Sequence, residues 1–165
     1  MVFRKKVENP MLAGTIEMMK ADNTPEHRLM MMEEIFQAEF LTPVRSIPAP
    51  VKNDDGTYRL EPGSKLQFPL INGKDGKQFF VACTNEGELV KCFKDDEDPH
   101  YFTVSFKELS EMQVRKDANG NMSPAVGIVI NPLSSNIIIP KEASVKYLLT
   151  LREEQLRKNQ PTNGQ

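Results

Sequence analysis

The chain has 165 residues, and 21 lysines and arginines stand against 23 aspartates and glutamates, for a formal net charge of -2 at pH 7. This length is typical of one domain with its own core. A nearly balanced charge supplies no broad positive field for phosphate backbones or anionic lipid, so no nucleic-acid or membrane-surface binding is expected. No stretch approaches the roughly 20 apolar residues of a membrane-spanning helix.

The two cysteines, Cys83 and Cys92, lie too far apart for a CxxC motif and are too few for a secreted disulfide framework. No basic neighbour is clearly arranged to lower their pKa, so we interpret both as small buried hydrophobes. The basic start of the chain, residues 1–6, is followed by Val7-Glu8-Asn9-Pro10 where an export signal needs an apolar stretch. These features predict a cytoplasmic protein.

Two helices are predicted near the N-terminus. The first begins with Asn9 as cap and Pro10 at the first helical position, and the second follows the break at residues 22–25. The apolar stripe expected on the second helix consists of Leu29, Met32, Ile35, Phe36 and Phe40. Together they predict a helical hairpin.

Methionines are concentrated on this hairpin, and Met30 and Met31 stand next to Met32. Three consecutive methionines on a helix cannot all point inward, and flexible methionine surfaces suit promiscuous binding. Two interpretations stay open: either Met30 and Met31 form a partner surface, or one of them is incidentally exposed beside a core filled by Met19 and Met32.

Several β segments follow. Residues 66–71 and 78–83 flank a glycine-bearing turn and are expected to pair as a hairpin, with Pro69 placing the first near an edge. The stretch from Val44 to Leu60 predicts edge β structure or a loop. Val126 to Ile130 is apolar on both faces, which favours the middle of the sheet.

Two short helices are predicted where Asn85 precedes Glu88 and where Ser105 precedes Glu108, because both spacings are typical of a capping box. The second is expected to follow directly on a strand over residues 101–106. A closing helix begins at Pro140 after a strand at 137–139.

The pattern as a whole predicts an α+β fold: a single domain with a mixed, mostly antiparallel sheet on which the N-terminal hairpin and the C-terminal helix pack. We expect an N-terminal tail at residues 1–8, the domain at 9–157 and a polar tail at 158–165.

No catalytic constellation is recognisable. The sequence lacks the GxSxG, GxxxxGK and GxGxxG motifs, so no cofactor is expected. His27 and His100 have no obvious catalytic company, and structural roles are expected for both. The acidic run from Asp95 to Asp98 beside His100 offers ligands for a divalent cation, although a solvated loop is the favoured interpretation.

One segment is particularly specific: Gly127-Ile128-Val129-Ile130-Asn131-Pro132 leading to Asn136-Ile137-Ile138-Ile139-Pro140. With Phe40-Leu41-Thr42-Pro43-Val44 and residues 78–84, it makes the chain resemble the N-terminal domain of the SseB (enhanced serine sensitivity) family. The resemblance implies a small bacterial cytoplasmic protein, and it supplies no catalytic residues. Longer members of the family carry a second, C-terminal domain.

Three functional hypotheses follow. The first is a non-enzymatic protein-interaction or regulatory module with an unidentified protein partner. The second is a small-molecule or amino-acid sensor, or a minor enzyme, with a pocket near Asn131, Pro132 and Asn136. The third is a homodimer, in which a second copy covers the apolar face of residues 145–151.

Overall fold

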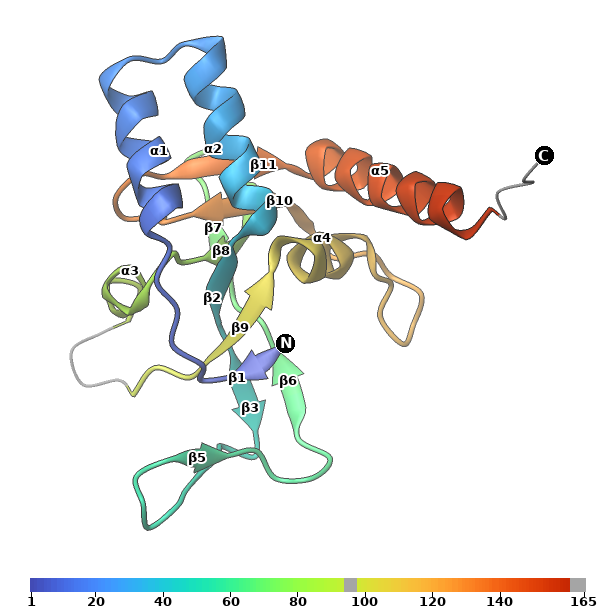
Figure 1. The fold of residues 1–165 in the computed structure, drawn as a ribbon. Coiled ribbons are helices and arrows are strands. Elements are labelled where there is room, and N and C mark those ends of the chain that lie inside the picture. Colours follow the sequence, from blue (N-terminus) through green and yellow to red (C-terminus); the bar gives the residue numbers. More distant parts are fainter. Residues whose placement is uncertain (94–97, 161–165) are drawn as a thin grey trace.

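The computed structural model describes residues 1–93 and 98–160, and it has the predicted α+β architecture (Figure 1). The helices are α1 (Pro10–Ala21), α2 (Pro25–Gln37), α3 (Glu86–Val90), α4 (Phe106–Val114) and α5 (Lys141–Asn159). The strands are β1 (Val2–Phe3), β2 (Glu39–Pro43), β3 (Arg45–Ile47), β4 (Val51–Lys52), β5 (Tyr58–Arg59), β6 (Lys65–Gln67), β7 (Leu70–Asn72), β8 (Gln78–Ala82), β9 (Tyr101–Ser105), β10 (Ala125–Ile130) and β11 (Ile137–Pro140).

The expected single sheet is divided into smaller ones. One sheet has the strand order β1-β9-β2 and another the order β11-β10-β8-β7, while β3 pairs with β6 and β4 with β5. These pairings are antiparallel except that between β8 and β10, which is parallel. Leu41 and Cys83 join the two larger sheets through two backbone hydrogen bonds of 2.8 Å.

The core lies on both faces of the joined sheets because successive residues of a strand point to opposite sides. In β8, Phe80 and Ala82 contribute to the main core, whereas Val81 belongs to a second cluster with Leu89 of α3. The main core also receives residues of α1, α2 and α4: Leu12, Ile16, Met31, Ile35, Phe106 and Leu109. The inner position of β10, between β11 and β8, confirms the prediction that it lies in the middle of a sheet.

The predicted hairpin of residues 66–71 with 78–83 is only half right. Leu70 pairs with Phe80 in the β7–β8 ladder, but Leu66 belongs to β6 and pairs with Ser46 of β3. Pro69 separates the two strands, since a proline cannot donate a ladder hydrogen bond. The preceding stretch forms short strands, with β5 and the β3–β6 ribbon extending from the lower end of the molecule in Figure 1.

The N-terminal helices α1 and α2 pack side by side, which confirms the helical hairpin (Figure 1). The Thr24 hydroxyl caps α2 by accepting the His27 N–H at 3.1 Å. The side-chain amide of Asn9 does not cap α1; it donates instead to the carbonyl oxygens of Glu39 and Thr84, each at 2.8 Å. Asn9 thereby ties the start of α1 to both larger sheets.

The buried face of α2 differs from the expected stripe. Met31 is only 5% exposed and lies in the core with Ile35, four residues later, whereas Leu29 is 60% exposed. Residues four positions apart lie on the same side of a helix. The side of α2 that packs on the core is therefore the one that carries Met31 and Ile35, and Leu29 lies on another side.

The two helices at the C-terminal end meet through a buried polar contact. Gln113 of α4 donates its Nε2 hydrogen to the Ser144 hydroxyl of α5 at 2.7 Å, and both residues are fully buried. Beyond this contact α5 extends away from the rest of the molecule (Figure 1).

Residues 1–8, predicted to be a tail, contribute β1, in which Val2 pairs with Thr103 of β9. At the other end, Lys158 and Asn159 complete α5, while residues 161–165 of the predicted polar tail lie outside the described residues. No helix in the described ranges combines the length and apolarity that crossing a bilayer requires.

Candidate functional site

One surface cavity is a groove of about 730 Å³ between the β6–β7 segment and the α4–β10 connection. We call it the apolar groove; its lining includes Met1, Leu66, Phe68, Leu70, Phe80, Met112, Arg115, Lys116, Asp117, Asn121, Met122 and Pro124. Its size falls in the range of sites that hold small ligands or the side chains of a partner.

The floor of the apolar groove rests on the main core. Phe80 is buried there, and Phe68, Leu70 and Met112 are partly buried against the same core. Met122 and Leu66 remain 44% and 39% exposed at its sides. A buried floor with the adaptable side chain of Met122 at its edge favours contact with apolar side chains of varied shape.

The rim of the apolar groove carries two cations, Arg115 and Lys116, from the end of α4. Within residues 1–93 and 98–160 neither forms an ion pair. The neighbouring Asp117 carboxylate is turned into its own loop, where it accepts the N–H groups of Asn119 and Asn121 at 2.8 and 2.9 Å. The Asn121 N–H is the main reason that the pKa of Asp117 is lowered.

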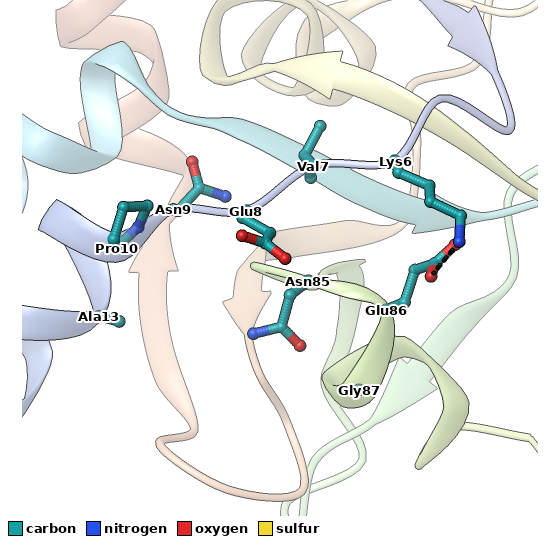
Figure 2. Close-up of a pocket in the computed structure, with 9 residues that line it drawn as sticks. All are labelled: Lys6, Val7, Glu8, Asn9, Pro10, Ala13, Asn85, Glu86 and Gly87. Carbon is teal, nitrogen blue, oxygen red and sulfur yellow. Dashed lines mark ion pairs between the residues drawn. The ribbon is translucent and has the colours of Figure 1, made fainter.

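A smaller cavity of about 470 Å³ lies between residues 6–10 and the start of α3 (Figure 2). We call it the polar groove; its lining residues are Lys6, Val7, Glu8, Asn9, Pro10, Ala13, Asn85, Glu86 and Gly87.

Most of the polar side chains of the polar groove already have structural partners. Lys6 and Glu86 form an ion pair at 3.4 Å, and the Tyr101 hydroxyl donates to Glu86 at 2.8 Å. Burial, followed by this bond to Glu86, raises the pKa of Tyr101 to about 12. Asn85 caps α3 by accepting the Glu88 N–H at 2.9 Å, but the Glu88 carboxylate bonds to Lys91 and Ser134, so only half of the predicted capping box forms. Glu8 is the lining carboxylate for which the described residues provide no ion pair.

The structure separates the two methionines predicted as a partner surface. Met30 is 42% exposed on α2, but Met31 is buried in the main core, so the prediction is corrected for Met31. The exposed methionines that share a surface cavity are Met1 and Met122, at the apolar groove, where Met112 joins them. Met1 is more than 100 residues away in sequence from Met112 and Met122, so its proximity to them has no sequence signal.

The Asn131-Pro132 turn is held by the asparagine itself. The backbone N–H of Thr84 donates to Asn131 Oδ1 at 3.0 Å, and Asn131 Nδ2 donates to the Thr84 hydroxyl at 3.0 Å. Asn131 and Asn136 have left-handed backbones, both with φ of 48°, and the Asn136 N–H closes the turn on the Asn131 carbonyl at 2.8 Å. These bonds give Asn131 a structural role, while ligand binding near Asn131, Pro132 and Asn136 stays a prediction.

His100 lies in a cluster with Arg4, Tyr58 and Asp98. The Arg4 guanidinium contacts Asp98 at 3.3 Å and His100 Nδ1 at 3.2 Å, and it lies 4.4 Å from the centre of the Tyr58 ring. The Tyr58 hydroxyl donates to Asp98, and this bond is the main cause of the lowered pKa of Asp98. Burial lowers the pKa of His100. The cluster fastens the β4–β5 ribbon to the body of the protein.

Of the acidic run predicted as a solvated loop or cation site, Asp98 is engaged by Arg4 and Tyr58, and residues 95–97 lie outside the described residues. Across the described part of the chain, no three histidine, cysteine, aspartate or glutamate side chains are grouped so as to hold a metal ion. His27 contacts the Asp22 carbonyl through Nδ1 at 2.6 Å, beside the cap of α2.

Comparison with curated proteins and comparison with solved structures each found no match. Comparison with protein families matches residues 12–143 to the SseB protein N-terminal domain. This match covers most of the chain: it runs from Leu12 in α1 to Ala143 in the first turn of α5 and includes every strand except β1. The chain therefore belongs to the family of SseB protein N-terminal domains.

Proposed function

We propose that this domain is a non-enzymatic protein-interaction module of the bacterial cytoplasm. Its apolar groove binds a partner segment that carries apolar side chains and at least one carboxylate. The observation that carries the proposal is the combination of a hydrophobic floor with the two rim cations Arg115 and Lys116, which have no carboxylate partner among the described residues.

The physical argument rests on complementarity. Apolar surface held out of the core is stabilised when a partner covers it, at roughly 25 cal/mol per Å². Charges at the rim of such a patch contribute chiefly to association rate and to the choice of partner. A basic rim around an apolar floor therefore selects partners that are both apolar and acidic.

The non-enzymatic part of the proposal is supported by how the titratable side chains are used. Glu86, His100 and Asp98 are engaged in contacts that hold segments together. A general base must reach a substrate proton at hydrogen-bond distance. These three groups instead contact other side chains of the same chain.

Site-specific photo-crosslinking tests the binding surface. A benzophenone side chain placed at Leu66 or Met122 should capture a discrete protein in the native cell. The matched positions Leu133 and Val90, which are 64% and 57% exposed on other parts of the surface, should not capture it. Equal capture at all four positions, or none at the groove, would exclude the apolar groove as the docking site.

The second candidate function is a small-molecule sensor that uses the polar groove. Its volume of about 470 Å³ suits a small ligand, and the Glu8 carboxylate is available for an ammonium group. A thermal-shift screen against amino acids and amines should then show stabilisation in the wild type that Glu8→Gln removes. At 100 times its dissociation constant a ligand stabilises the fold by about 2.7 kcal/mol.

The homodimer also stays a prediction, and α5 is the surface to examine. Val145, Leu149 and Leu156 on α5 are exposed. Light scattering over a range of concentrations distinguishes a monomer from a dimer, and Leu149→Glu should dissociate a dimer that forms through α5.

A further inference from the structure

The two cysteines of the chain are brought together by the fold, although their spacing in sequence gave no sign of it. Cys83 follows the end of β8, and Cys92 follows the end of α3. Both contribute to the second core cluster, with Leu41, Val81 and Leu89. Each thiol is the largest influence on the pKa of the other, as expected of neighbouring side chains in one cluster.

The two thiols differ in access. Cys83 is fully buried, whereas Cys92 is partly exposed. A water-soluble oxidant therefore reaches Cys92 first, and Cys83 becomes accessible only to the sulfur of Cys92. This order is the one found in proteins in which an exposed thiol is oxidised and a neighbouring thiol resolves it.

The electrostatics support the same division of roles. Hydrogen bonding from Cys83 is the largest cause of the lowered pKa of Cys92, and burial works against it. The same bond, with burial, raises the pKa of Cys83. The positive charge of Lys91 helps the Cys92 thiolate, while Glu88 opposes it. Because the thiolate is the nucleophilic form, Cys92 is the sulfur that attacks.

We propose that Cys83 and Cys92 form a reversible intramolecular disulfide when the protein meets a peroxide. The Cys92 thiolate attacks one peroxide oxygen, the O–O bond breaks, and Cys92 becomes a sulfenic acid while the other oxygen leaves as water or an alcohol. The Cys83 sulfur then attacks the sulfenic sulfur, and the sulfenic hydroxyl leaves as water with the Cys83 proton. Two thiols lose two electrons in total, and the peroxide takes them.

The bond would fasten the end of α3 to the end of β8. The start of α3 lines the polar groove through Asn85, Glu86 and Gly87, so α3 links the disulfide to that cavity. The sulfurs must approach to about 2.05 Å, and because both side chains pack in the same cluster, a local shift of the segment after α3 would bring them together.

The experiment uses the full chain, which contains no other cysteine. After treatment with hydrogen peroxide, the intact mass should fall by about 2 Da, and a peptide joining the two cysteines should appear. Dithiothreitol should then restore the original mass and remove the joined peptide. Circular dichroism before treatment confirms that each variant is folded.

Two variants separate the roles of the cysteines. In Cys83→Ser, Cys92 has no resolving thiol and should be trapped by dimedone as a sulfenic acid. In Cys92→Ser, Cys83 should resist peroxide and alkylating reagents while the protein is folded. A wild type that gains oxygen atoms at Cys92, or that yields only disulfide-linked dimers, overturns the proposal; so does a Cys92→Ser protein that reacts as fast as the wild type.

Discussion

Asn131 and Thr84 are joined side chain to side chain and side chain to backbone where the parallel strands β10 and β8 end. Asn131 is 5% exposed and has a left-handed φ of 48°. This position requires a residue that adopts a left-handed backbone and that can both donate and accept a hydrogen bond. Asparagine meets both requirements, because it tolerates this backbone better than most residues and its amide offers a donor and an acceptor.

Two substitutions at Asn131 distinguish the contribution of the amide from that of the left-handed backbone. Asn131→Ala loses the amide and is strained, so it should lower the free energy of unfolding by about 3 kcal/mol. Asn131→Gly loses only the amide and should be about 1 kcal/mol less destabilised than the alanine variant. Urea denaturation measures both; equal losses would mean that the backbone conformation costs nothing here.

Gly127 is a second position, in the segment from Gly127 to Pro140, where the structure restricts the residue: there is no room for a side chain. A Cβ atom at Gly127 would lie 2.5 Å from the Ile139 carbonyl oxygen in the paired strand β11. Gly127→Ala must push β11 away and should destabilise the protein by about 1–3 kcal/mol. Gly14→Ala on α1 is the matched control, since nothing lies within 4 Å of its new methyl group. It should be neutral or stabilising by up to about 1 kcal/mol, as alanine favours helix.

Local patterns predicted many of the elements. The Ser105–Glu108 capping box is present with both of its hydrogen bonds, and the apolar run at 126–130 does occupy an inner strand. Each of these depends on residues close in sequence, where spacing and propensity carry the information.

What could not be predicted depends on distant partners. Packing against other elements decides which side of α2 is buried. It also decides that residues 66–71 are divided between the β3–β6 and β7–β8 pairs. The apolar groove likewise combines Met1, the β6–β7 segment and the α4–β10 connection. The methionines predicted an adaptable surface at Met30 and Met31; Met30 is exposed on α2, whereas Met31 lies in the core.

The buried contact between Gln113 and Ser144 gives a prediction about α5. Ser144→Ala would leave the Gln113 amide buried without its one hydrogen bond, in addition to its Oε1 atom, which already lacks a partner among the described residues. The expected loss is about 1–3 kcal/mol.

A double variant tests whether that loss comes from the unsatisfied amide. Gln113→Leu with Ser144→Ala removes both polar groups, so it should recover much of the stability lost in Ser144→Ala. A double variant no more stable than Ser144→Ala would show that the unsatisfied Gln113 amide is not the cause of the loss.

The α4 capping box predicts a pH dependence. Burial raises the pKa of Glu108, but hydrogen bonds from the N-terminal amine and Ser105 outweigh it, so the folded-state pKa lies below its ordinary value of 4.5. The stability contributed by this carboxylate is therefore fully present above the unfolded-state pKa and is lost as the pH falls through the folded-state pKa.

Glu108→Gln isolates this contribution because it keeps a similar shape without the charge. The wild type should be more stable than Glu108→Gln at neutral pH, and the gap should close as the pH falls below about 4. Thermal denaturation across pH 3 to pH 7 measures the gap. A gap that widens in acid would mean that the carboxylate is stabilised less in the folded state than in the unfolded state.

The most direct test of the docking proposal is photo-crosslinking from Met122 with the rim charges reversed. Arg115→Glu with Lys116→Glu should abolish the adduct formed at Met122, whereas Arg152→Glu with Lys158→Glu, an equal reversal on the exposed part of α5, should leave it unchanged. An adduct of the same yield in both double variants would contradict selection of an acidic partner by the apolar groove.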